Sequence, residues 1–186
     1  YQNDKQDDSQ LLEPVITCNK PEINAVAVFS QTDSKRLPVI PEQKAGEPVY
    51  LTLDFGKVFT ARSITYLMNP KGKATTSATN VPGPPSDTFV GTGYRVLPDI
   101  GELEVSDDGV HFKKVCQLKP IYKDHGGLNQ KTISFPAVAG RYFRLNLHDW
   151  NEKDERKRQL ELGKVLLSAR ACVDQWEEKA GLFSEY

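Results

Sequence analysis

The stretch Gly101–Cys116, GELEVSDDGVHFKKVC, decides the fold of this chain. In its first part the apolar residues Leu103 and Val105 alternate with polar ones, which is the period of a half-buried strand. The Asp108-Gly109 pair that follows is a strong hairpin signal, because glycine accepts the positive φ that a tight turn requires. The stretch therefore predicts a β-hairpin.

The second half of this stretch returns to an apolar pattern at Val110, Phe112 and Val115. The pattern slips at Lys113-Lys114, where a β-bulge would fit. Because strand-like runs lie on both sides of the hairpin, we expect an all-β, antiparallel sandwich around it.

Working outward, the strand-like runs are rich in β-branched and aromatic side chains. We expect strands over 15–19, 49–55 and 61–68 before the hairpin, and over 118–122, 132–135, 141–147 and 160–171 after it. The run AVAVF at 25–29 is either a buried strand or an ordered segment after a turn.

Two segments do not fit the strand pattern. Residues 69–98 form a long stretch without clear structure of its own, a length that is usually functional or disordered, although its aromatic residues indicate that its later half packs down. In 173–181, Asp174, Glu177 and Gly181 predict a short helix with a capping box and a glycine stop. We expect a flexible lead-in at 1–13, one sandwich domain at 14–172, and a linker with this helix at 173–186 toward a further domain.

Composition narrows the class of partner. Lys plus Arg number 24 and Asp plus Glu number 25, so the chain lacks the basic excess that a nucleic-acid partner or an anionic membrane surface requires. No apolar run approaches the roughly 20 residues of a membrane span. The chain begins at Tyr1 without a visible signal peptide, so we expect a processed product or an excised piece.

The three cysteines lack the spacing of a metal site. They are either free thiols, or Cys18 and Cys172 form a bridge between the chain ends.

The order of motifs resembles that of a known family. YLTLDFGK at 50–57, RSITY at 62–66, the hairpin GELEVSDDGVHFKKV, ISFPAVAGRYFRLNL at 133–147 and LELGKVLLSA at 160–169 are similar to the marks of discoidin-type, coagulation factor C-domain-like domains. The resemblance covers about 14–172 and implies a galactose-binding-domain-like jelly roll of about eight strands, with 69–98 as a long inserted loop. The insertion and the ending SARACVDQWEEKAG also resemble a domain embedded in large bacterial glycoside hydrolases, the family 106 α-L-rhamnosidases.

The resemblance sets expectations for function. It implies a noncatalytic carbohydrate-binding module of a larger carbohydrate-active enzyme, in a periplasmic or extracellular location, with a glycan or adjacent domains of the parent enzyme as partners. The alternatives are a domain-packing module without a sugar site and a protein or cell-surface adhesion module. We expect no cofactor: the family's calcium loop has an Asp-Gly that is missing after Asn24-Ala25.

The residues themselves indicate no catalytic or metal centre. The three histidines lie far apart, without the i, i+4 pairing of a metal helix. Glu102 and Glu104 lie two residues apart on one strand, where we expect a solvated face rather than an acid and base pair.

Candidate ligand-binding residues must lie in loops on a rigid scaffold, where an aromatic ring stacks on a sugar and polar groups bond its hydroxyls. Trp150 stands among charged residues and is covered by the sandwich edge, by a neighbouring domain or by a sugar ring. Phe89 and Tyr94 form an aromatic platform or pin the insertion down, and Arg141 resembles a late-strand arginine of the family. The candidates are Trp150, His148, Asp149, Asn151, His125, Tyr94, Phe89 and Arg141.

Overall fold

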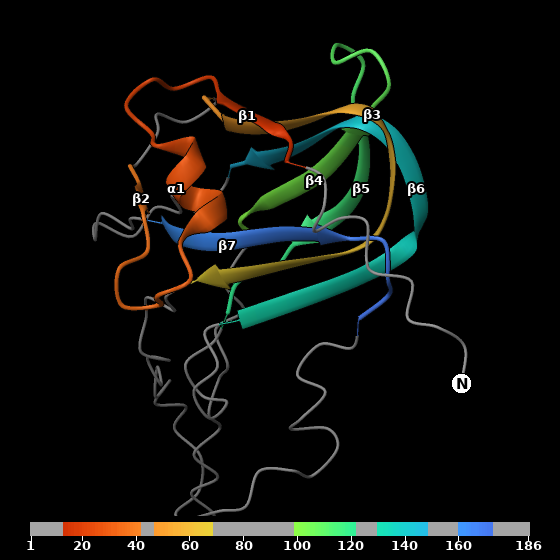
Figure 1. Ribbon diagram of the computed structural model, residues 1–186. Coiled ribbons are helices and arrows are strands. Elements are labelled where there is room, and N and C mark those ends of the chain that lie inside the picture. Colours follow the sequence, from red (N-terminus) through yellow and green to blue (C-terminus); the bar gives the residue numbers. More distant parts are fainter. Residues whose placement is uncertain (1–12, 42–46, 69–98, 122–129, 149–159, 173–186) are drawn as a thin grey trace, which may run out of the picture.

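The computed structural model describes residues 13–41, 47–68, 99–121, 130–148 and 160–172, and these form an antiparallel β-sandwich with one short helix (Figure 1). Within these ranges the elements are β1 (Val15–Cys18), α1 (Ala25–Ser30), β2 (Val39–Ile40), β3 (Val49–Met68), β4 (Gly101–Ser106), β5 (Lys113–Leu118), β6 (Gln130–Leu147) and β7 (Leu160–Ser168). The all-β prediction is confirmed. The expected helix at 173–181 lies outside the described residues.

Two long strands, β3 and β6, run through both layers of the sandwich. The strand order is β2-β7-β3-β6-β4-β5, with β1 also paired to β3. Residues 49–54 of β3 and 142–147 of β6 lie with β1, β4 and β5 in what we call the first layer, while 59–68 and 130–140 lie with β7 and β2 in the second layer. The sequence suggested two separate strands in each of these regions, but each pair is one strand bent at a corner.

The corner is built from a register shift in which residues 55–58 of β3 face only Arg141 of β6. Gly56 has a φ of +69° there, a conformation that glycine adopts without strain. Its N–H donates a hydrogen bond to Asp54 Oδ1 at 2.7 Å. The Arg141 guanidinium donates hydrogen bonds to both oxygens of the same carboxylate, at 2.7 and 2.8 Å. These hydrogen bonds, that to Arg141 above all, hold the pKa of Asp54 below its usual range.

The core lies between the two layers and follows the period of two along the strands. Leu51, Leu103 and Leu145 are opposite one another across β3, β4 and β6, and none has accessible surface. Tyr66 of the second layer is also fully buried and donates its hydroxyl hydrogen bond to the Lys119 carbonyl beside the first layer. This bond ties the layers together near the end of β5.

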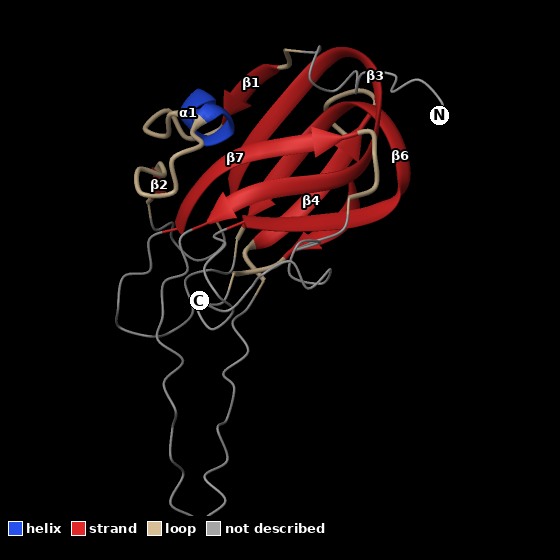
Figure 2. Ribbon diagram, turned by 60° about the horizontal axis from the view of Figure 1, so that its bottom comes forward, coloured by secondary structure: helices blue, strands red, loops and turns tan. Residues whose placement is uncertain are grey.

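The segment 25–29 is helical, not a strand. Asn24 caps the helix, since its side chain accepts a hydrogen bond from Ala27 N–H at 3.1 Å. Ala25 and Val28, three residues apart, are buried, whereas Val26 is exposed. The short Ala-Val run is compatible with the period of a strand and with that of a helix. The Asn24 cap favours the helix. Figure 2 shows α1 beside β1 and β7, the strands it contacts.

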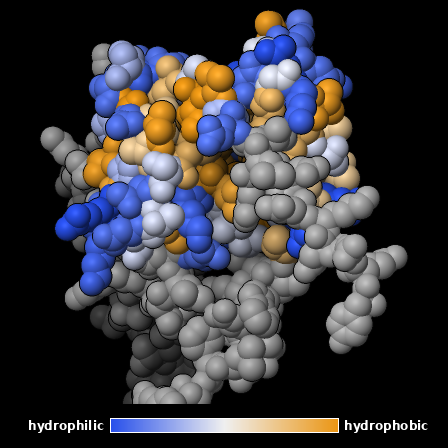
Figure 3. Space-filling view, in the orientation of Figure 1, coloured by the Kyte–Doolittle hydropathy of each residue, from blue (hydrophilic) through white to orange (hydrophobic). Residues whose placement is uncertain are grey.

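The central hairpin is confirmed, with its bulge one residue later than expected. Leu103 pairs with Cys116 and Glu104 with Lys114, so Val115 is the extra residue. Val110 at the turn is exposed rather than part of an apolar face. On the face in Figure 3, hydrophobic groups are separated by hydrophilic ones.

The described cysteines form no disulfide. Burial is the main cause that raises the pKa of the Cys116 thiol, to about 11. No helix of the described residues is long and apolar enough to cross a membrane.

Candidate functional site

Most of the loop residues expected to bind a ligand lie outside the described residues: Phe89, Tyr94, His125, Asp149, Trp150 and Asn151. The described residues that flank their segments nevertheless come together. The His148 N–H donates to the Ile100 carbonyl at 3.1 Å, and the Ile100 N–H donates to the Leu118 carbonyl at 2.9 Å. The chain therefore leaves β5 and β6, and enters β4, at one end of the first layer, which we call the loop end.

His148 and Arg141, the two candidates within the described residues, lie far apart. Arg141 begins the second part of β6 and His148 directly follows its end, and seven residues of extended chain span about 23 Å. Arg141 is at the corner, bound to Asp54, whereas His148 is at the loop end. The structure does not bring them into one small site, and it places Arg141 in a contact that stabilises the corner.

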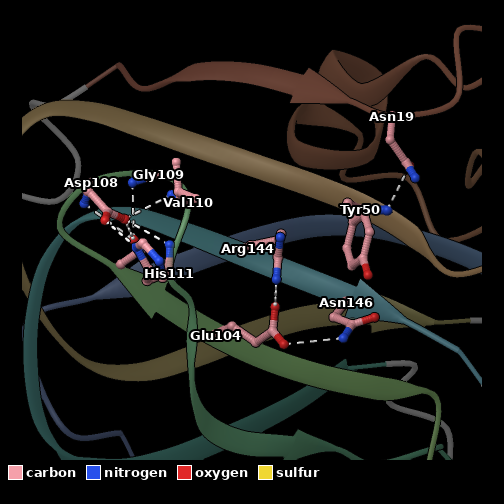
Figure 4. A network of polar contacts seen from close by, with 10 residues as sticks. Asn19, Tyr50, Glu104, Asp108, Gly109, Val110, His111, Arg144 and Asn146 are labelled. Carbon is pink, nitrogen blue, oxygen red and sulfur yellow. Dashed lines mark hydrogen bonds and ion pairs between the residues drawn. The ribbon is translucent and has the colours of Figure 1, made fainter.

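The outward side of the first layer carries a polar cluster next to the loop end, which we call the polar face: Tyr50, Glu102, Glu104, Gln117, Arg144 and Asn146. Figure 4 shows four of these residues, Tyr50, Glu104, Arg144 and Asn146. These side chains alternate with the buried core residues of β3, β4, β5 and β6. Along residues 142–147 of β6 half-buried and buried residues alternate, so this part of the strand has a polar and an apolar face.

Arg144 is the centre of the polar face. Its Nε and Nη2 both lie 2.6 Å from Glu104 Oε2. The Tyr50 ring centroid lies 4.3 Å from the guanidinium carbon and the Phe112 centroid 3.6 Å from it. The two side chains of the ion pair are only 20% and 12% exposed, so aromatic rings shield a charge pair on the outer side of a sheet.

This arrangement corrects the expectation for Glu104. Glu104 is not on a solvated face, because it is 9% exposed and paired with Arg144. Phe112 lies against Arg144 on the outer side of the first layer. The spacing of residues 102 and 104 gave the strand face correctly, but it could not reveal a partner 40 residues away in sequence.

Two amide oxygens near the loop end have almost no accessible surface and no hydrogen-bond partner among the described residues: Asn146 Oδ1 and Gln117 Oε1. The Asn146 orientation follows from chemistry, since its amide nitrogen lies 3.2 Å from Glu104 Oε1, which only accepts when ionised. Both residues are opposite Glu102 in one row across β6, β4 and β5. Sequence reasoning missed this row, because Asn146 and Gln117 stand in ordinary strand positions.

The hairpin turn holds a second polar cluster, also drawn in Figure 4. Asp108 accepts from the N–H groups of Val110 and His111 at 2.8 Å each, and its other oxygen lies 2.6 Å from His111 Nδ1. These bonds, that of the His111 side chain first, lower the pKa of Asp108. The residues of this cluster satisfy one another, so the cluster stabilises the turn.

Both carboxylates of the polar face are in ion pairs. Glu102 is paired with Lys114 at 2.7 Å, as Glu104 is with Arg144. Within the same residues, no three His, Cys, Asp or Glu side chains converge as metal ligands would.

No family model matches the sequence. No curated protein matches it either. Solved structures do match the fold. A rhamnosidase from Novosphingobium sp. PP1Y aligns over 92% of this chain with 22% identity and a TM-score of 0.54, and this chain spans 13% of that enzyme's length.

Isolated modules match over nearly their whole length. The CpGH89CBM32-6 module of Clostridium perfringens aligns over 87% of this chain and 98% of its own, with 13% identity and a TM-score of 0.52. A chitosan-binding module from a Paenibacillus sp. IK-5 chitosanase/glucanase aligns over 84% and 95%, with 12% identity and a TM-score of 0.51. The chain therefore has the galactose-binding-like β-sandwich fold of CBM32-type modules, as the order of its motifs predicted.

Proposed function

We propose that this chain is a noncatalytic carbohydrate-binding module of a larger carbohydrate-active enzyme. The observation that carries the proposal is the near-complete overlap with an isolated CBM32 module, 87% of this chain on 98% of that one. The alignment with a small part of a rhamnosidase supports a parent of that class. The proposed location is periplasmic or extracellular, as the resemblance of the motifs implies. The pairing of both carboxylates on the polar face with cations supports binding rather than catalysis.

The proposed ligand lies at the loop end. Six of the eight candidate residues belong to segments whose described neighbours, Ile100, Ile121 and His148, belong to this end or directly follow its strands. A rigid sheet that presents several segments at one end is the usual setting for a binding site. Trp150 follows His148 by two residues and supplies the aromatic ring on which a sugar would stack.

The test is a glycan array followed by titration calorimetry with the full chain. We expect binding of at least one glycan, weakened about tenfold or more by Trp150→Ala, because stacking and desolvation of such a ring contribute on the order of 1–3 kcal/mol. The matched control is Trp176→Ala, the same change in the expected linker. Equal affinities for Trp150→Ala and the unaltered chain would contradict the assignment of the ring.

A domain-packing role is the second candidate, because the rhamnosidase shows that this fold occurs within a much longer chain. It predicts no glycan binding on the array and a stable complex between this chain and the remainder of its parent protein. Calorimetry of the two separately expressed parts distinguishes the roles.

A further inference from the structure

We propose that the corner of the domain, opposite the loop end, is the surface against which a neighbouring domain of the same parent enzyme packs. This inference rests on the proposed role as a module of a larger enzyme, and it adds the surface and the partner. It begins with side chains that are open to solvent. The three most exposed large hydrophobic side chains among the described residues are Val110 at 73%, Val15 at 66% and Val58 at 65%.

These three valines lie at the same end of the first layer. Val58 belongs to the corner itself, and Val110 belongs to the hairpin turn. Figure 1 shows this turn projecting beside the corner of β3 and β6. The last row before the corner, across β1, β3, β6 and β4, consists of Val15, Asp54, Tyr142 and Ser106. Val58 follows this row by four residues along β3, and Val110 follows it by four residues after β4.

Aromatic packing gives this end a fixed shape. The half-buried Phe55 ring stacks on Phe59, with 4.6 Å between centroids, and meets Phe143 edge-on at 5.8 Å. Phe59 and Phe143 are buried in the core, so apolar packing continues from the core to the surface. On the hairpin side, Gly109 packs against Tyr142, since a Cβ at Gly109 would lie 3.3 Å from the tyrosine ring. Because this end is already ordered, a partner that binds it loses little conformational entropy.

The size of the exposed apolar set decides between partners. We call the set Val15, Phe55, Val58 and Val110 the corner surface. A stable interface between two free proteins buries about 800 Å² on each side and involves about 20–30 residues. Domains of one chain need less contact, because their linker gives an effective concentration on the order of millimolar. A few apolar side chains therefore fit a tethered domain better than a free protein or a second copy of this chain.

The positions of the described chain ends fit this partner. Val15 begins β1 in the row next to the corner, so a domain that precedes it in the parent can reach the corner surface. At the other end, the Cys172 N–H donates to Ser134 Oγ at 3.1 Å. Ser134 is opposite Ser63 in the second layer, five residues before the end of β3 at Met68. Neither chain end belongs to the loop end, so a neighbour at the corner leaves the proposed ligand site accessible.

Hydrogen exchange of backbone amides, compared between the full chain alone and the intact parent protein, tests the proposal. We expect residues 55–58 and 107–112 to exchange at least about tenfold more slowly in the parent, because the neighbouring domain covers them. Residues 33–36, in the turn between α1 and β2, are the internal control and should exchange equally in both proteins.

Val58→Asp combined with Val110→Asp places two charges on the corner surface, and burying an unpaired charge in an interface is unfavourable. Because both side chains are exposed, the melting temperature of the isolated chain should stay unchanged, while the slow exchange in the parent is lost. The matched control is Val26→Asp, the same change at a side chain 60% exposed on α1, which should leave the slow exchange intact.

Three outcomes are distinguished. Equal exchange in the chain and in the parent, or slow exchange that survives the double change, overturns this inference. Concentration-dependent association of the isolated chain in sedimentation, abolished by the double change, assigns the corner surface to a second copy and also overturns it. Glycan binding is measured separately on the isolated chain, and its absence contradicts the proposed carbohydrate-binding function without affecting the corner surface.

Discussion

The shielded ion pair of Arg144 and Glu104 gives the most quantitative prediction. Arg144→Met keeps an unbranched apolar side chain between the rings of Tyr50 and Phe112 but removes the charge that Glu104 needs. Breaking a fully buried pair costs about 3–5 kcal/mol, because the remaining charge stays uncompensated. With the Glu104 side chain 12% exposed, some water reaches it, and we expect about 2–4 kcal/mol.

The second arm of the test is Glu104→Gln, alone and with Arg144→Met. Glutamine keeps an acceptor for the guanidinium, so the single change should cost about 1–2 kcal/mol. Once the charge of residue 104 is gone, the loss of Arg144 matters less. The double variant should therefore be more stable than the sum of the single changes predicts, by about 1–2 kcal/mol.

Urea unfolding followed by circular dichroism measures these differences, provided that the slope against urea concentration is unchanged. Arg141→Met is the control within the same strand, because its pair with Asp54 is more exposed and should matter less. A loss below about 0.5 kcal/mol for Arg144→Met, or additive costs in the double variant, would show that solvent screens the pair and would refute the reasoning.

Three further predictions concern the scaffold. Gly101→Ala should abolish or severely impair folding, seen as loss of the cooperative melting transition, because a Cβ there would lie in contact with the Asn146 carbonyl oxygen and φ is +151°. Asp108→Ala should lower the melting temperature at pH 7. The difference between variant and unaltered chain should disappear in acid. The reason is that the lowered pKa of Asp108 stabilises the fold at pH values above the usual carboxyl pKa of 3.8, and this stabilisation is lost as the pH falls through the lowered value. At pH 8 the exposed Cys172 should react with a thiol reagent before Cys116, whose pKa is raised to about 11; equal rates would contradict the burial of Cys116.

The fold could be predicted from sequence because its signals are local. The Asp-Gly turn and the alternation on either side of it specify the hairpin, and the same alternation in 141–147 assigns the two faces of β6. The sequence could not show that residues 49–54 and 59–68 belong to one bent strand, because a glycine such as Gly56 is found both at strand ends and at bends. Only the pairing of both parts with β6 shows that they form one strand.

The candidate site was less predictable, because it depends on contacts distant in sequence. Nothing near Arg144 indicates that it pairs with Glu104 between rings of β3 and the hairpin. Loop reasoning did identify His148 at the end of β6. It could not tell that Arg141 lies at the corner within β6 and pairs with Asp54.

The bend shared by β3 and β6 also determines which parts of the domain can unfold locally. Because both strands pair in both layers, neither layer can separate without breaking the ladder between them. Brief local openings are then confined to the edges, β1, β2 and β5, and amide hydrogens of β3 and β6 should exchange only when the whole domain unfolds. A load applied across the domain would be carried by the same two strands, so that the loop end keeps its geometry while the edge strands fluctuate.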